Sequence, residues 1–274
     1  MLAVTELGKE YLDEGVTLLK GCIDAKLIKQ TSDKYDELNE TLTSQETPRE
    51  KPRLAFWLHV TGNKVTRFCG YDEFPEAWEL MVKNVVPVIR QHFTNDDGTP
   101  LRMQLLETIL FNKPPTAGAL LQWHQDASYY PLKPNKQVAV WIPFEPVTKE
   151  SGALVYAKNT HKGELRATVD LYSNEAFSNE SRALIPVDPA AEGYELRLME
   201  MNQHDMILHD GYIWHYSGPN TTVDRQRRGL SLRFLVEEAV FSPRPDGLNE
   251  AQAFDAQSDI KPGEIFQGSA FPMV

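Results

Sequence analysis

From residue 101 onward, the sequence consists of short runs of alternating or β-branched apolar residues, separated by glycine, proline and asparagine. Such punctuated runs are typical of β-strands joined by turns. A chain with this pattern buries its apolar side chains by packing two sheets together or by closing a barrel. We therefore predict an antiparallel barrel or sandwich, with strands within residues 101–111, 137–147, 152–157, 195–201, 205–216 and 228–236.

The residues before this β-rich part are predicted to be mostly helical. Apolar residues recur every three or four positions between residues 5 and 45, around a short strand-like piece, GVTLLKG. Residues 72–93 carry a second helical pattern, and Pro75 lies in its first turn, where a missing N–H costs little. We expect one domain of three parts, namely a helical 1–100, a barrel core 101–240 and a C-terminal tail 241–274.

The composition excludes several classes of function. The formal net charge of −11 disfavours binding to nucleic acid or to an anionic membrane surface, since both require clustered Lys and Arg. No apolar stretch reaches the ~18 residues that span a bilayer, and the N-terminus does not resemble a signal peptide. With only two cysteines, Cys22 and Cys69, we expect reduced thiols and a cytoplasmic protein. The oligomeric state is left open.

A candidate metal site stands out at His124-Gln125-Asp126. In an extended strand, residues i and i+2 point to the same face, so His124 and Asp126 can reach one ion together. This step alone is a weak signal, because an isolated histidine in an apolar strand is usually structural. A second histidine follows at His215. Two imidazoles and one carboxylate form the facial ligand set of non-haem iron(II) oxygenases, which leaves other positions open for chemistry.

Basic residues follow His215 at Arg225, Arg227 and Arg228. A buried guanidinium can bind a carboxylate through two hydrogen bonds and stays charged, which suits the far carboxylate of 2-oxoglutarate. A solvated turn is the structural alternative, and three arginines leave room for one inside and others outside. We interpret His59, His92, His161, His204 and His209 as structural, with at most a supporting role for His209 next to its Asp210-Gly211 turn.

Together these segments resemble the phytanoyl-CoA dioxygenase family of Fe(II)/2-oxoglutarate-dependent oxygenases. The resemblance is carried by ILFNKPP, WHQDASYYPLKP, VAVWIPFEPVTKESGALVYAKNTHKGE and HYSGPNTTVDRQRRGLSLRF, and it runs through most of the chain. It implies a mainly β protein with flanking helices and a double-stranded β-helix core, also called a jelly-roll or cupin-like barrel. It further implies an oxidoreductase with Fe(II) as cofactor and with 2-oxoglutarate and O2 as cosubstrates.

The resemblance also implies roles for single residues. His124, Asp126 and His215 would hold the iron, and the presence of the Asp126 carboxylate favours hydroxylation over halogenation. Counting seven positions back from Phe234 selects Arg227 as the cofactor arginine. The remaining residues implied at the 2-oxoglutarate pocket are Ser217, Trp141 and Ile109.

The predicted reaction is hydroxylation of a small molecule, with succinate and carbon dioxide as co-products. Aromatic residues near the ligands are candidates for the substrate pocket, although each could equally belong to the barrel core, and the 162–193 loop and the tail could cover it. These aromatic residues are Tyr129, Tyr130 and Trp214, with Trp123 and Tyr212 beside them. The alternative function is a metal-binding cupin-like barrel, an isomerase or binding module, without 2-oxoglutarate chemistry. A non-catalytic scaffold ranks last, because all three ligands are present.

Overall fold

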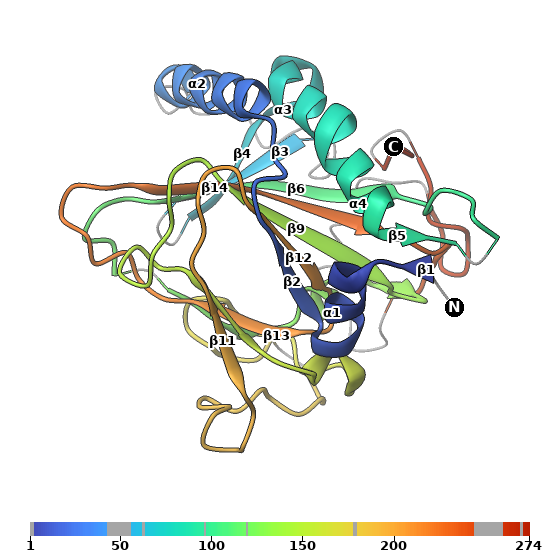
Figure 1. The fold of residues 1–274 in the computed structure, drawn as a ribbon. Helices are drawn as coiled ribbons and strands as arrows, with labels where there is room; N and C mark the ends of the chain where they lie inside the picture. Colours follow the sequence, from blue (N-terminus) through green and yellow to red (C-terminus); the bar gives the residue numbers. More distant parts are fainter. Residues whose placement is uncertain are drawn as a thin grey trace.

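The computed structural model describes residues 3–42, 56–61, 64–95, 97–118, 120–177, 180–243, 260–268 and 271–274. Two facing β-sheets dominate these residues (Figure 1). The larger sheet contains, in spatial order, β2 (Val16–Leu19), β12 (Met206–Asp210), β9 (Gln137–Pro143), β14 (Arg227–Leu235), β6 (Gln104–Lys113), β3 (Phe56–Thr61) and β4 (Lys64–Gly70). The smaller sheet contains β11 (Leu196–Met199), β10 (Leu154–Ala157), β13 (Trp214–Ser217) and β7 (Leu121–His124).

Almost all neighbouring strands in these two sheets are antiparallel; the pair β3 and β6 is parallel. From β9 onward the chain crosses repeatedly between the sheets, so β9, β12 and β14 lie in the large sheet while β10, β11 and β13 lie in the small one. This is the jelly-roll arrangement, and it confirms the predicted mainly β fold with flanking helices and a double-stranded β-helix core.

The helices that follow β2 cover the face of the large sheet that points away from the small sheet (Figure 1). The first helix lies beside the edge strand β2, where Glu10 and Glu14 pair with Arg197 of the small sheet. Thr5 Oγ1 caps the first helix by accepting from Gly8 N at 3.3 Å, and Gly15 ends it with a φ of 85°. The predicted helix–strand–helix is therefore confirmed, and so is the helix predicted within 72–93, which a π-helical turn interrupts. The helical elements are α1 (Glu6–Glu14), α2 (Ala25–Leu42), α3 (Pro75–Leu80), the π-turn Met81–Val85 and α4 (Val86–His92).

Alternation along β14 shows how one strand serves two environments. Leu230 and Leu232 are fully buried and belong to the large apolar core under the helices. The odd-numbered residues of the strand face the small sheet instead, because successive side chains in a strand point to opposite faces. Arg227, Ser231 and Arg233 consequently line the space between the two sheets. The polar interior of the barrel thus follows from a two-residue period in the sequence.

The first hundred residues are less helical than predicted. They also contribute β2 and the hairpin β3–β4 to the large sheet, and β3 extends that sheet beside β6. β3 pairs with β4 in a local hairpin and with the distant strand β6, and neither pairing leaves the helical periodicity that the prediction relied on. Because both halves of the chain build one sheet, we propose a single domain.

The described parts of the tail are packed against the barrel. The strand β15 (Val240–Phe241) pairs with β8 (Leu132–Lys133), and Phe266 and Phe271 are 1% and 2% exposed in a cluster with Tyr130. The remaining short pair joins β1 (Ala3–Val4) to β5 (Phe93–Thr94). The 244–259 part of the predicted tail lies outside the described residues.

Two smaller predictions concern loops and thiols. Between residues 163 and 195, the described residues form turns and one isolated bridge, Val169 with Ala176, so the predicted long loop is confirmed. Cys22 and Cys69 form no disulfide. Within the described ranges, no helix has the length and apolar character needed to cross a membrane.

Candidate metal centre

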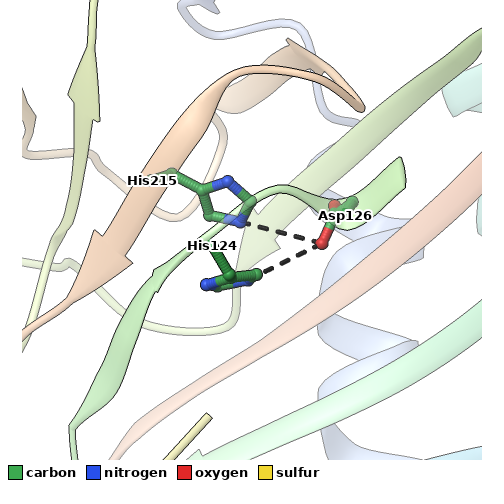
Figure 2. A group of neighbouring side chains, drawn as sticks. All are labelled: His124, Asp126 and His215. Atoms are coloured by element: carbon green, nitrogen blue, oxygen red, sulfur yellow. Dashed lines mark ion pairs between the residues drawn. The ribbon is translucent and has the colours of Figure 1, made fainter. Parts of the chain in front are cut away.

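Three side chains from two neighbouring strands converge between the sheets. His124 ends β7 and lies opposite His215 on β13, while Asp126 begins the 3-10 turn Asp126–Tyr129 that follows β7. The Nε2 atoms of His124 and His215 lie 3.7 and 3.8 Å from Asp126 Oδ1 (Figure 2). One ligand atom from each residue lies within 4.8 Å of the others, and all three residues are buried. The structure therefore brings the three predicted ligands together.

The second nitrogen of each histidine fixes its tautomer. His124 Nδ1 lies 2.6 Å from Gln122 O, and His215 Nδ1 lies 3.1 Å from Ile213 O. A carbonyl oxygen only accepts, so Nδ1 carries the hydrogen and Nε2 keeps its lone pair toward Asp126. Burial also lowers the pKa of both histidines, which favours the neutral rings that metals bind. These donors fit a divalent iron that prefers imidazole and carboxylate ligands.

The Asp126 carboxylate is held by two groups from the large sheet. His209 Nε2 donates to Asp126 Oδ2 at 3.1 Å, and Arg233 Nη2 donates to Asp126 Oδ1 at 2.7 Å. In a neutral imidazole the other nitrogen then accepts, and the Tyr156 hydroxyl donates to it at 3.0 Å. Arg233 also pairs with Glu107 at 2.8 Å. The carboxylate is thus oriented from both sides before any metal arrives.

Charge explains why this buried carboxylate is ionised. Burial alone would raise the pKa of Asp126, but the positive charge of Arg233, together with His215 and the hydrogen bond from His209, holds it well below its usual range. Conversely, Asp126 and Glu107 outweigh the effect of burial and raise the pKa of Arg233. The pair is therefore charged throughout the neutral pH range.

Arg227 enters the same cavity from β14. It is 1% exposed, its guanidinium stacks on Trp141 at 4.2 Å from the ring centre, and its Nη2 lies 3.5 Å from Ser217 Oγ. Its Nε–H is buried without a hydrogen-bond partner. Burial lowers the pKa of Arg227 to about 10, so the group is still a cation at neutral pH. Among the described residues, no carboxylate forms an ion pair with it.

The other two arginines of the cluster lie outside the barrel. Arg228 points to the opposite face of β14, where it pairs with Glu145 and Asp36, and Arg225 is exposed. The alternation of β14 thus places only Arg227 of the three inside.

The cavity that joins these groups is small, about 30 Å³. The predicted pocket-wall residue Ile109 is buried but packs against Leu58 and Val60 beside the cavity, and Phe111 lines the cavity two residues further along β6. The lining residues are Phe111, Leu121, His124, Asp126, Trp141, Leu154, His209, His215, Arg227, Ser231 and Arg233.

The aromatic substrate candidates occupy three different places. The ring of Tyr129 meets His124 edge-on at 6.1 Å, and its hydroxyl donates to Val169 O at 2.6 Å. Tyr130 packs on the tail and donates to Glu107, so it reaches the metal centre only through Glu107 and Arg233.

The position of Trp214 does not support its predicted substrate-binding role. It alternates with His215 on β13, so its side chain points away from the metal and packs with Ala157 and Ile185. Trp123 stacks on Tyr216 on the same outer side. Tyr212 lines a separate groove outside the large sheet.

The long loop covers the ligand strand. Gln122 N donates to Leu171 O at 2.8 Å, Thr168 Oγ1 donates to Ser128 O at 2.8 Å, and Arg166 N donates to Gln125 Oε1 at 2.6 Å. In this structure the loop is therefore closed over β7 and the turn that carries Asp126.

The sequence allowed His209 a supporting role without indicating Asp126 as its partner, and Arg233 and Lys113 were not predicted at all. A usable signal existed for Arg233, which lies six positions after Arg227 and thus on the same face of one strand. His209 is given at most a supporting role from sequence because a turn at Asp210-Gly211 separates it from His215. This turn ends β12 and leads the chain to β13 in the opposite sheet. The ring centroids of His209 and His215 therefore lie 4.8 Å apart.

The family model described as "Phytanoyl-CoA dioxygenase (PhyH)" matches residues 11–229. The chain belongs to the phytanoyl-CoA dioxygenase family. This confirms the resemblance, and with it the predicted class of enzyme, a 2-oxoglutarate-dependent non-haem iron oxygenase. The matched residues include all three candidate ligands and Arg227.

Two relatives align with this chain over most of their own length. A Stutzerimonas stutzeri protein named "Probable alpha-ketoglutarate-dependent hypophosphite dioxygenase" is 24% identical over 244 residues, 85% of this chain and 79% of the relative. A Caenorhabditis elegans protein named "Probable phytanoyl-CoA dioxygenase" is 26% identical over 237 residues, 83% of this chain and 74% of the relative.

Among solved structures, two enzymes of nogalamycin biosynthesis share the fold. The epimerase SnoN, in complex with Fe3+, alpha ketoglutarate and nogalamycin RO, is 17% identical with a TM-score of 0.67, covering 98% of this chain and 97% of that one. The carbocyclase SnoK is 17% identical with a TM-score of 0.68, covering 99% and 96%.

Proposed function

We propose that this protein hydroxylates a small molecule in a reaction that depends on Fe(II), 2-oxoglutarate and O2 and releases succinate and carbon dioxide. The observation that carries the proposal is Arg227. Its buried guanidinium shares one cavity with His124, Asp126 and His215, and no carboxylate among the described residues pairs with it. A buried cation without a counter-ion is costly unless a ligand supplies the negative charge.

We assign the residues as follows. His124, Asp126 and His215 would hold the iron through two Nε2 atoms and one carboxylate oxygen. Arg227 would bind the far carboxylate of 2-oxoglutarate, Ser217 would turn its hydroxyl toward the same group, and Trp141 would keep the guanidinium flat against its ring. Ile109 would support the pocket wall from behind.

Other residues prepare the centre for the reaction. When bound, the iron and 2-oxoglutarate supply an oxidant made from O2, which attacks a substrate C–H bond. His209 and Arg233 keep Asp126 ionised and aimed, so its geometry need not be rebuilt in each cycle. The closed loop that includes Thr168 and Leu171 excludes water, and Tyr129 beside His124 would contact the substrate.

The substrate we propose is a free small molecule rather than a coenzyme A thioester. The net charge of −11 disfavours the phosphates of coenzyme A, which require a basic groove. Relatives are named for both kinds of substrate: one is a probable hypophosphite dioxygenase and one a 1-deoxypentalenic acid 11-beta-hydroxylase, while others are phytanoyl-CoA dioxygenases.

The test is succinate release by the purified protein with Fe(II), ascorbate and 2-oxoglutarate, with and without fractions of a metabolite extract. We expect turnover that rises with one fraction and disappears in His124→Ala. Arg227→Met should weaken 2-oxoglutarate binding by several kcal/mol, because the bound carboxylate loses its partner. The matched control Arg228→Met changes an arginine on the outer face of the same strand. If Arg227→Met binds 2-oxoglutarate as well as Arg228→Met does, the metal-binding barrel without 2-oxoglutarate chemistry becomes the better assignment.

A further inference from the structure

Lys113 is a buried lysine whose ammonium group ends inside the barrel. It is the last residue of β6, lies opposite Arg227 in the β6–β14 register and is 5% exposed. Its Nζ donates to Ser217 O at 3.1 Å, to Ser217 Oγ at 2.9 Å and to Gly218 O at 2.6 Å. In the ammonium form, all three hydrogens of the group are used on one short segment.

That segment needs an outside donor. The pairing of β13 with β7 is irregular between His215 and Ser217, just where the strand ends. The Lys113 ammonium bonds the Ser217 and Gly218 carbonyls there, and the Ser217 hydroxyl in turn donates to Gly152 O at 2.9 Å. Lys113 thus fixes Ser217 at a position two residues after the metal ligand His215.

The charge around Lys113 is unbalanced. Within the described parts of the chain no carboxylate forms an ion pair with Lys113, and the charge that acts on it is that of the cation Arg227. Burial, followed by repulsion from Arg227, lowers the pKa of Lys113 to about 6. At neutral pH Lys113 is therefore largely a neutral amine beside the cation Arg227, and a bound carboxylate would supply the negative charge that favours its ammonium form.

We infer that Lys113 is a positioning residue of the cosubstrate pocket: it locks Ser217 in place and, with Arg227, sets up a doubly cationic site for the far carboxylate of 2-oxoglutarate. This inference rests on the proposed function, and it adds a residue that makes no contact with the cosubstrate itself. Lys113 acts through the Ser217–Gly218 segment and through its charge.

A proton should therefore enter with the cosubstrate. The groups that face Lys113 are Arg227 from β14, the Ser217–Gly218 segment from β13 and Tyr172, which lines the same small space. Burial raises the pKa of Tyr172 to about 12, so it does not titrate near neutrality. A bound carboxylate favours the ammonium form of Lys113, so binding takes up a proton and weakens as the pH rises from 6 to 8.

The experiment is calorimetric titration of 2-oxoglutarate into the Mn(II)-loaded protein, which avoids turnover. Measurements at pH 6, 7 and 8, in buffers that differ in ionisation enthalpy, report both affinity and proton uptake. We compare the unmodified protein with Lys113→Met, which keeps the length of the side chain, and with Lys83→Met, an exposed lysine of the helical layer.

We expect Lys113→Met to bind 2-oxoglutarate more weakly at pH 6 by about tenfold or more, with a flattened pH profile and reduced proton uptake. Its affinity for Mn(II) and the behaviour of Lys83→Met should be unchanged. A lower melting temperature with unaltered 2-oxoglutarate affinity would mean a purely structural role and would overturn the inference.

Two further outcomes are separable. If Lys113→Met does not fold, the inference is tested by the proton uptake of the unmodified protein on 2-oxoglutarate binding. The absence of any proton uptake between pH 6 and 8 overturns the inference. If the unmodified protein fails to bind 2-oxoglutarate at all, the proposed function itself fails.

Discussion

Replacing Arg233 by methionine tests the electrostatic account of the metal centre most directly. Arg233 is 7% exposed and bridges two carboxylates, Asp126 at 2.7 Å and Glu107 at 2.8 Å. Methionine fills a similar volume without charge. In the metal-free protein the variant leaves the buried Asp126 and the partly buried Glu107 without their shared cation, and Asp126 keeps the hydrogen bond from His209.

The expected magnitude is large. Removing one partner of a buried ion pair costs about 3–5 kcal/mol, because the remaining charge stays desolvated. For a chain of this size, 1 kcal/mol corresponds to roughly 2 °C, so the melting temperature should fall by about 6–10 °C. A bound divalent metal supplies the missing positive charge to Asp126, so saturating Mn(II) should recover a large part of this loss.

The assay is thermal unfolding in EDTA and in saturating Mn(II). The matched control is Arg228→Met on the same strand, since Arg228 pairs with Glu145 and Asp36 at a partly exposed site and such pairs contribute about 0–1 kcal/mol. The reasoning is refuted if Arg233→Met in EDTA is no less stable than Arg228→Met, or if Mn(II) stabilises both variants equally.

Three further predictions concern the surroundings of this centre. His209→Phe removes the donor to Asp126 Oδ2 and should weaken Mn(II) binding by about 10–100-fold in a metal titration; unchanged binding would show that Arg233 alone orients the carboxylate. Gly229→Ala would place a methyl group against the Trp141 ring and 2.9 Å from Ile142 O, so it should shift Trp141 and weaken 2-oxoglutarate binding in the same calorimetric assay, unlike Ser231→Ala. Burial lowers the pKa of His59 to about 4, so the folded state resists its protonation, and stability is lost as the pH falls below ~6.5. Urea unfolding at pH 7 and pH 5 should therefore show about 2 kcal/mol more loss for the unmodified protein than for His59→Gln, and equal losses would contradict this.

Local periodicity was enough to predict most of the elements. Apolar residues recur about every 3.6 positions in the helices within residues 5–45 and about every second position in the strands after residue 101. These spacings predict the helices and strands directly. The hairpin β3–β4 escaped prediction although its own pairing is local, whereas the parallel pairing of β3 with β6, about 50 residues away, leaves no local pattern. The π-turn at Met81–Val85 left no recognised signal in its residue types.

At the site, the sequence by itself determined the ligand set. His124 and Asp126 share a face through their two-residue spacing, and His215 with Arg227 completed the pattern of a facial iron centre. What only the tertiary structure decided is which groups meet across the barrel. Strand alternation predicts that Trp214 and His215 point to opposite faces of β13, but not which face lies inside the barrel. Only the fold shows that His215 faces the cavity and Trp214 the outer side.

The same reason accounts for the contacts that sequence reasoning missed. Lys113, His209 and Arg233 lie on three different strands of the large sheet, and their contacts reach Ser217 on β13 and Asp126 beside β7 in the small-sheet half of the barrel. One-dimensional spacing gives the face on which a side chain lies. The partner that it meets is set by strand register and by the closure of two sheets around a common cavity, and both depend on contacts between segments far apart in the chain.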